Sequence, residues 1–377
     1  MLTKAFARAG SPPMHPAAAR RILRLSFGTA SCLLFSQLLA WPLSFIAPLL
    51  TLSLLALPLP ALGLKKSVGL VIAIMAPMVA GMALLPFLQH AQWVAVLLVA
   101  LALFHSFYFT ARGGSPALGT FMTIGLTLTV TIGSVSSVIM MFLVKMVGLC
   151  AVVGIAFVAI SHALLPDLPP DPALAGMKKP PPPKPDPSRA GRNALRSLAI
   201  VFPLTLLFLF MSASPSYTVV MIKVATMGQQ ASTDKSREMG RSLMESTLWG
   251  GLGAIIAWNI MALWPSLVLY TLLVALAGLV YGRYIFRGPA VHPKFQMVSY
   301  AYLTMIVILA PAVMDGAASS GAGGAFWSRL LLFVLIAVYG TLAVWAFDAL
   351  FPGGQRRRQS PKATAAALRS PSRARAH

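Results

Sequence analysis

The chain alternates between long apolar runs and short polar segments, and this pattern predicts its main elements. Charges and turn residues separate twelve apolar runs, six on each side of a proline-rich segment. They cover residues 23–40, 43–62, 68–88, 93–110, 117–135, 141–165, 194–211, 217–227, 243–263, 267–285, 295–313 and 326–350. A helix needs about 20 apolar residues to cross the hydrocarbon core of a bilayer. The pattern therefore predicts an all-α polytopic membrane protein with about twelve transmembrane helices.

The composition agrees with this class and excludes a soluble domain. Of the 377 residues, 58% are hydrophobic and only 10% are charged, with 30 Lys and Arg against 8 Asp and Glu. A basic excess can indicate a nucleic-acid partner, but these cations lie in short clusters between apolar runs, so we expect no such partner. Cys32 and Cys150 both lie within apolar runs, which argues against a disulfide framework or a zinc site. No metal or cofactor is expected.

The basic clusters also predict the orientation of the helices, because cytoplasmic loops of membrane proteins are enriched in Lys and Arg. With the N-terminus inside, almost all cations fall in cytoplasmic segments. They are Lys65, Lys66, Arg112, those from Lys178 to Arg196, Lys235, Arg237, Arg241, Arg283, Arg287, Lys294 and Arg356 to Arg358. Trp41, Trp93, Trp264 and Trp327 fall at the opposite ends of the runs, where amphipathic rings favour the interface. Both termini are predicted to be cytoplasmic.

The second half of the chain repeats the first. Residues 97–102 and 272–277 both read LLVALA, and each run is followed by an Arg-Gly pair at the same offset of 175. Further matches are Arg24 with Arg196, Lys66-x-x-Gly69 with Arg237-x-x-Gly240, Trp93 with Trp264, and residues 162–166 with 348–352. Because each copy has an even number of helices, the copies share one orientation. We predict two parallel six-helix repeats related by an axis along the membrane normal.

The resulting organisation has five parts. A basic cytoplasmic tail covers residues 1–20, the first repeat 21–166, a linker 167–191, the second repeat 192–352, and a basic disordered tail 353–377. The linker contains four consecutive prolines, Pro180 to Pro183, which cannot continue a helix and favour an extended, solvated chain.

The second run of each repeat is irregular, and such matched irregularities often mark the binding site of a transporter. Residues 43–62 contain Pro48, Pro58 and Pro60 together with Thr51 and Ser53. The counterpart, residues 217–227, is short and contains Lys223. We therefore predict a substrate site between the halves, formed by Lys223, Tyr217, Thr218, Pro48, Thr51 and Ser53.

Lys223 is the most informative single residue. Its predicted position near the middle of the membrane is costly for a cation, so it should face the bundle interior or a wet cavity. A functional Lys223 would attract an anionic substrate group such as a carboxylate. The alternative is a structural lysine that snorkels or pairs with carbonyls at a helix end.

Other charged residues are candidates for secondary roles. Lys145 and Arg329 lie at equivalent positions near the outer ends of their runs and could form a cationic outer mouth or anchor the helices at the interface. Proton coupling needs a titrating group in a cavity. Its candidates are Glu245, Asp348 and His162, with His105 behind them. Glu245 is the first choice, although Arg241 four residues earlier could simply pair with it.

The basic starts of the two halves and the Lys66-x-x-Gly69 and Arg237-x-x-Gly240 pair resemble the fusaric acid resistance and aromatic acid exporter superfamily. Leu70 and Arg241 stand where that superfamily has Thr, and its large cytoplasmic domain is missing. The resemblance is to a compact branch. It implies multi-pass location in a bacterial inner membrane and efflux of aromatic or other organic acids, with a periplasmic membrane-fusion protein and an outer-membrane channel as partners.

These observations favour a non-enzymatic exporter or efflux-pump component for small amphipathic organic acids, driven by the proton gradient. Three alternatives stay open: a scaffold that anchors a periplasmic partner, a membrane-embedded lipid-modifying enzyme, and a channel. The sequence also leaves open whether the protein forms homo-oligomers in the lipid bilayer.

Overall fold

The computed structural model describes residues 15–41, 43–57, 59–133, 136–168, 187–210, 218–231, 236–287, 290–292, 294–314 and 322–351. Residues 1–14 of the predicted N-terminal tail, the predicted C-terminal tail, most of the linker, and Tyr217 lie outside these residues. The first half contains α2 (Pro16–Leu38), α3 (Ile46–Leu55), α4 (Leu64–Ala83), α5 (Leu85–His90), α6 (Gln92–Ala111), α7 (Pro116–Gly133) and α8 (Ser137–Leu164). The second contains α10 (Pro187–Phe210), α11 (Thr218–Ala231), α12 (Ser236–Leu263), α13 (Leu267–Ile285), α14 (Phe295–Met314) and α15 (Ala322–Leu350). A hairpin of two short strands, β1 (Phe286–Arg287) and β2 (Ala290–Val291), joins α13 to α14.

The predicted fold class is confirmed, because the described chain is helical apart from this hairpin and rich in apolar spans. Eight helical segments are long and apolar enough to cross a membrane within the described residues, with α4 and the first half of α5 counted as one span of 24 residues. The spans Leu267–Ile285 and Phe326–Leu350 have the bounds that the hydrophobic runs predict. The remaining helices are α2, α7 and two short ones, α3 with 10 residues and α11 with 14.

Three helices begin about two turns before the run that the apolar pattern predicts. They are α2, which begins at Pro16, α10, which begins at Pro187, and α12, which begins at Ser236. Proline suits the first turn of a helix, since its missing N–H would have no helical partner there. Arginines in the first two turns of α2 and α10 are compatible with helices that continue beyond the hydrocarbon, which an apolar pattern alone does not reveal.

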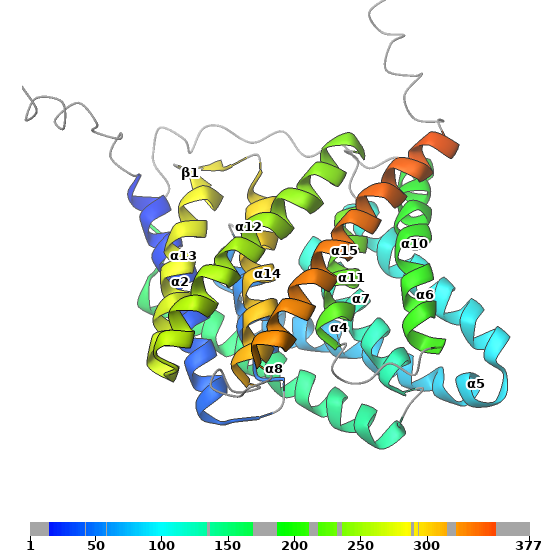
Figure 1. Ribbon diagram of the computed structural model, residues 1–377, viewed down its shortest axis with the longest axis horizontal. Coiled ribbons are helices and arrows are strands. Elements are labelled where there is room, and N and C mark those ends of the chain that lie inside the picture. The colour runs from blue at the N-terminus through cyan, green and yellow to red at the C-terminus, as the bar shows by residue number, and fades with distance from the viewer. Residues whose placement is uncertain are drawn as a thin grey trace, which may run out of the picture.

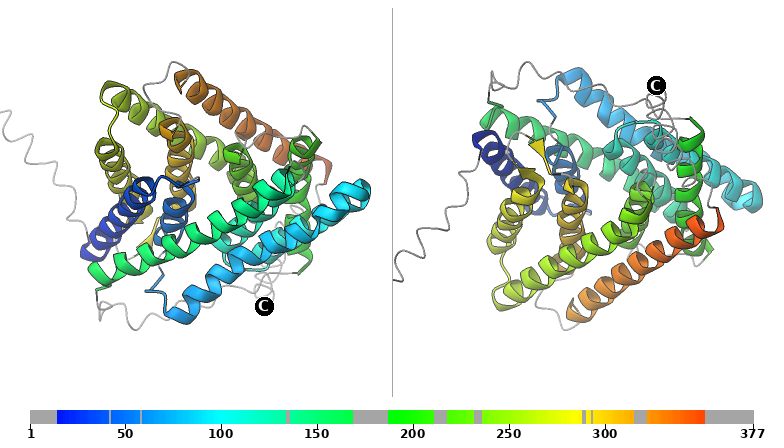
Figure 2. Two further views of the ribbon diagram at one scale, coloured as in Figure 1. Left: turned by 90° about the horizontal axis from the view of Figure 1, so that it is seen from below. Right: turned by 90° about the horizontal axis from the view of Figure 1, so that it is seen from above.

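The helix contacts occur in matched pairs, as a duplication requires. α4 packs on α7 as α12 packs on α14, and α3 packs on α8 as α11 packs on α15. The halves also exchange contacts, because α2 of the first packs on α13 of the second, while α10 of the second packs on α6 of the first. α11 packs on α7 and α3 on α14 in the same crossed manner. Figure 2 shows the resulting interlocked bundle from both ends. The two halves therefore share one core.

The first helix of each half runs in the same direction. In Figure 1, α2 and α10 both begin at the upper face, where α8 and α15 end. We call this the terminal face. Matching ion pairs hold these ends together: Arg24 of α2 binds Asp167 just after α8 at 2.7 Å, and Arg196 of α10 lies 3.6 Å from Asp348 of α15.

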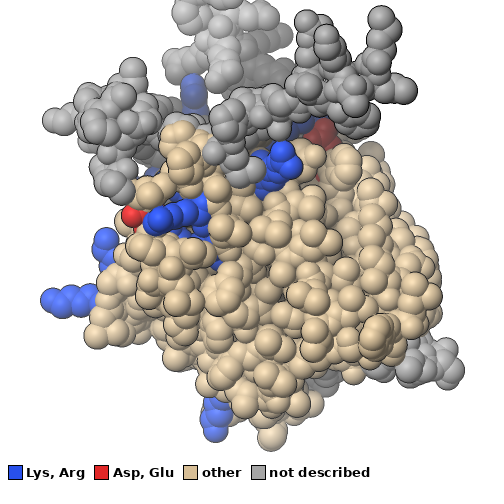
Figure 3. Space-filling view, turned by 90° about the vertical axis from the view of Figure 1, so that its left-hand side faces the viewer, with Lys and Arg blue, Asp and Glu red and all other residues tan. Residues whose placement is uncertain are grey.

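The surface between the two faces is apolar. Figure 3 shows a broad uncharged band below the upper edge, near which the Lys and Arg side chains gather. Large apolar side chains on several helices are more than half exposed, including Leu97, Val268 and Leu331. Trp93 is 82% exposed and Trp264 74% exposed, both at helix ends away from the terminal face. This distribution is that of a protein whose outer surface meets lipid.

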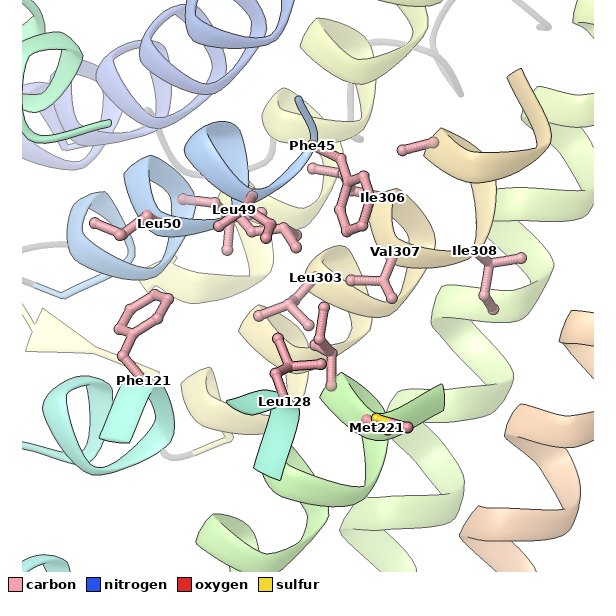
Figure 4. Close-up of a cluster of buried hydrophobic side chains, with 14 of the residues drawn as sticks. Phe45, Leu49, Leu50, Phe121, Leu128, Met221, Leu303, Ile306, Val307 and Ile308 are labelled. Atoms are coloured by element: carbon pink, nitrogen blue, oxygen red, sulfur yellow. The ribbon is translucent and has the colours of Figure 1, made fainter. Parts of the chain in front are cut away.

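Four helices from both halves meet at the centre of the molecule. Figure 4 shows Leu49 and Leu50 of α3, Leu128 of α7, Met221 of α11 and Leu303 of α14 converging there. α14 is the most enclosed of the candidate spans, with 72% of its apolar window buried. The irregular helices α3 and α11 thus belong to the core between the halves.

Candidate functional site

Lys223 lies in the middle of α11 with its side chain enclosed by the second half. The residue is only 3% exposed. Its Nζ donates a hydrogen bond of 3.2 Å to Oγ1 of Thr304 on α14. The same ammonium lies 5.6 Å from the ring centroid of Phe333 on α15. Three helices therefore converge on one buried cationic group.

No described carboxylate forms an ion pair with Lys223. The ion pairs within the described residues involve Asp167, Glu245 and Asp348, all with other partners. A hydroxyl and an aromatic face stabilise an ammonium, but they do not neutralise it. An enclosed cation without a counter-ion is energetically costly. An incoming anion would compensate this cost.

α12 and α14 approach each other closely beside Thr304. A Cβ on Gly250 of α12 would lie 2.4 Å from the carbonyl oxygen of Ala301 and 2.7 Å from Cβ of Thr304. Only glycine allows the two backbones to approach so closely. Gly250 therefore allows α12 and α14 to pack closely beside Thr304, the hydrogen-bond partner of Lys223.

α11 carries a polar face that the sequence reasoning did not single out. Lys223, Thr226 and Gln229 recur at a spacing of three residues and are all buried. Nε2 of Gln229 donates to Oγ1 of Thr123 at 2.6 Å and to the carbonyl oxygen of Gly119 at 2.9 Å, both on α7 of the first half. This three-residue spacing in a short apolar helix is a signal in the sequence that could have revealed Gln229.

The first-half site residues have other partners. Oγ1 of Thr51 bonds to the carbonyl oxygens of Ala47 at 3.0 Å and of Gly154 at 3.1 Å, so it faces α8. Oγ of Ser53 donates to the carbonyl oxygen of Leu49. Pro48 is buried in α3. Thr218 begins α11, and Tyr217 lies outside the described residues. Of the six predicted substrate residues, Lys223 is the one that places a buried charge beside a hydroxyl and an aromatic ring of other helices.

The space between the halves is small and apolar. One cavity of about 30 Å³ is lined by α3, α4, α7, α8, α11 and α14, with Ile222 and Leu303 among its walls. A neighbouring cavity of about 60 Å³ shares Ser53, Thr120 and Leu303 with it. These volumes hold a few water molecules at most. Since Lys223 is only 3% exposed, a substrate that reached it would have to separate helices.

The candidates for proton coupling lie away from Lys223, in polar contacts near helix ends. Glu245 binds Arg241 at 2.5 Å and Lys294 at 3.2 Å. Asp348 belongs to the pair with Arg196. Nδ1 of His162 lies 2.9 Å from the carbonyl oxygen of Val158, and His105 makes the same contact with its own helix. A coupling role for these residues stays a prediction.

The predicted outer-mouth cations lie on separate helices. Lys145 is exposed in the third turn of α8, and Arg329 is half-buried in the third turn of α15. Figure 2 places α8 and α15 on opposite flanks of the bundle. The structure does not bring these two residues together, although their equivalent positions agree with the repeat. No group of three or more His, Cys, Asp or Glu side chains that could hold a metal occurs in the described part of the chain.

Comparison with known proteins gives one match. Residues 21–161 match the model of a family described as proteins of unknown function, DUF2955. The matched segment runs from α2 to α8 and contains the six main helices of the first half. Neither the curated proteins nor the solved structures contain a match. The chain is thus a helical, membrane-type protein whose first half resembles a family without an assigned activity.

Proposed function

We propose that this protein is an exporter, or the membrane component of an efflux pump, for small amphipathic or aromatic organic acids. The observation that carries the proposal is Lys223, an enclosed cation with Thr304 and Phe333 beside it and no described carboxylate paired with it. A carboxylate of the substrate would supply the missing negative charge. An aromatic body would pack against Phe333 and the apolar residues around it.

The two-fold arrangement supports a transport cycle. Parallel repeats with short, irregular helices in matched positions are typical of transporters that expose one site alternately to each side. As helices, α3 and α11 reach about 15 Å and 21 Å at 1.5 Å per residue, short of a ~30 Å hydrocarbon core. Movement of α11 relative to α14 and α15 would expose Lys223. Binding of the anion to Lys223 would offset the free energy that separating these helices requires.

The remaining elements of the proposal follow the resemblance to the fusaric acid resistance and aromatic acid exporter superfamily. The protein would lie in a bacterial inner membrane with the terminal face in the cytoplasm. The proton gradient would drive export, with Glu245 the first candidate to carry the proton. A membrane-fusion protein and an outer-membrane channel would complete the path out of the cell.

The test is flux of an aromatic carboxylate through liposomes that contain the purified chain, with a pH gradient imposed across the membrane. We expect Lys223→Met to lower the rate at least tenfold, because the counter-charge is lost while the volume of the side chain is kept. Lys65→Met is the matched control, because Lys65 is exposed in the first turn of α4. It should stay within twofold of the original chain.

Two outcomes would contradict the proposal at different levels. Unchanged flux in a well-folded Lys223→Met variant would remove the assigned site and leave transport standing. No flux of any tested organic acid by the original chain would remove transport by the chain alone and favour a scaffold for a periplasmic partner.

A further inference from the structure

A lateral groove opens on the apolar surface of the second half. It lies between α12, α13 and α14 and has a volume of about 460 Å³, within the range of ligand sites in proteins. Its rim includes Trp249 and Ile256 of α12 and Leu276 of α13, which are 57%, 53% and 56% exposed. We call it the α12–α14 groove. It is separate from the small cavities between the halves.

The floor of the groove explains why it stays open. Gly250 and Gly253 bring α12 against α14, where Ala301 and Met305 line the groove. The hydroxyl of Tyr281 on α13 donates to the carbonyl oxygen of Trp249 at 2.8 Å and so bridges α12 and α13 beneath the rim. Close contact at the floor leaves the rim side chains spread apart, with apolar surface facing outward.

Charged residues surround the end of the groove at the terminal face. Tyr284, near the end of α13, and Met297, near the start of α14, line this end. Lys294 directly precedes α14 and bridges to Glu245 of α12, which also binds Arg241. Arg241 and Lys294 are 78% and 57% exposed, whereas Glu245 is 22% exposed. Two outward cations therefore share one partly covered carboxylate.

We propose that the α12–α14 groove binds one acyl chain of an anionic phospholipid whose headgroup contacts Lys294 and Arg241. The groove opens where the apolar band meets lipid, so an acyl chain replaces no water and leaves no polar group unpaired. The excess positive charge at its end matches a phosphate and an anionic headgroup. Tyr284 is amphipathic and suits the boundary between chain and headgroup. This inference does not depend on transport.

Trp249 in the rim provides a direct probe. In a variant that retains Trp249 and replaces the other six tryptophans by Phe, lipids with brominated chains quench its fluorescence on contact. We expect brominated phosphatidylglycerol to displace unlabelled lipid about fivefold more readily than brominated phosphatidylcholine does. One basic residue near a headgroup accounts for a preference of about that size.

Matched variants localise the effect. Arg241→Gln with Lys294→Gln should remove the preference, and Glu245→Gln should increase it. Lys65→Gln with Lys66→Gln is the control, because these exposed lysines begin α4, the equivalent helix of the first half. It should leave quenching at Trp249 unchanged. A variant that retains only Trp345, 71% exposed on α15, should show no headgroup preference.

Three outcomes would overturn the proposal: equal quenching by both headgroups at Trp249, a preference that survives loss of both cations, or no quenching by either lipid. The last would mean that another protein surface, such as a second copy of the chain, covers the groove. Should the tryptophan replacements impair folding, native mass spectrometry of the chain with all its tryptophans tests the same headgroup preference. Phosphatidylglycerol should stay bound in preference to phosphatidylcholine, and Arg241→Gln with Lys294→Gln should abolish that preference.

Discussion

The two halves of the molecule share one set of helix contacts but differ at the centre of their second helices. At the offset of 172 that relates Arg24 to Arg196, Thr51 of α3 is the counterpart of Lys223 of α11. Both side chains take part in equivalent packing, since Thr51 faces α8 and Lys223 reaches Phe333 of α15. Thr51 bonds to two carbonyl oxygens, whereas Lys223 has a single hydroxyl partner and an aromatic ring.

The difference between Thr51 and Lys223 shows that a duplicated fold can place a buried charge in only one of its halves. The equivalent contacts of α3 and α11 hold both helices in the core, so stability alone does not require a lysine there. The first half shows that a small hydroxyl suffices at this position. The second half keeps an enclosed cation and builds Thr304 and Phe333 around it. This contrast supports our proposal that α11 recognises the ligand, with α3 as its packing counterpart.

The largest expected effect on stability distinguishes the α12–α14 crossing from the equivalent α4–α7 crossing. Gly250→Ala should lower the free energy of unfolding by about 2 to 3 kcal/mol, because the new methyl group meets the backbone carbonyl of Ala301 at 2.4 Å. Gly81→Ala, at the α4–α7 crossing, meets side-chain atoms alone among its nearest neighbours, Thr129 at 2.9 Å and Leu126 at 3.6 Å, and should cost less, about 1 kcal/mol. Unfolding in mild detergent, followed by circular dichroism, measures both.

Equal costs for the two variants would contradict this ranking. They would show that the α12–α14 contact adjusts as readily as the contact in the first half. The position of Thr304 would then not depend on Gly250.

A smaller effect is expected at the ends of the halves. Arg24 is 4% exposed and donates to the carbonyl oxygen of Leu165 at 3.1 Å as well as to Asp167. Arg24→Met should cost about 2 kcal/mol, because buried hydrogen bonds to a charged group are lost. Asp167→Asn should cost about 0.5 kcal/mol, since this carboxylate is 43% exposed. The shift in unfolding midpoint in detergent compares them, and a larger shift for Asp167→Asn would show that the ion pair matters more than the carbonyl contact.

Much of the fold follows from the sequence, because the bilayer imposes a length on each apolar run. The runs at 267–285 and 326–350 coincide with the observed spans. The register of the repeat also anticipates the matched contacts, such as α4–α7 and α12–α14. The exchange of α2 and α10 between the halves could not be predicted in this way. In lipid, apolar faces do not distinguish one partner from another, and close packing at residues such as Gly278 against Ser26 decides the contact.

Less of the candidate site could be predicted. Lys223 is conspicuous because a charge within an apolar run is rare and costly. Thr304 lies 81 residues further along the chain, and no periodicity links the two. Phe333 looks like an ordinary packing residue until the tertiary structure brings it beside a charge. Glu245 and Asp348 are conspicuous in the sequence for the same reason as Lys223, yet they bind nearby cations.

The sharpest test of the comparison is a pair of variants expected to change stability in opposite directions. Thr51→Val removes a buried hydroxyl bonded to Ala47 and Gly154 and should lower the free energy of unfolding by about 1 kcal/mol. Lys223→Leu replaces an enclosed cation by an apolar group, which is neutral or stabilising when no ion pair is lost. Its unfolding midpoint in detergent should therefore equal or exceed that of the original chain. In flux measurements the order should reverse, with Thr51→Val within twofold of the original rate and Lys223→Leu at least tenfold slower. A lysine kept for structure would destabilise the protein on removal, whereas one kept for ligand binding leaves a stable, inactive protein.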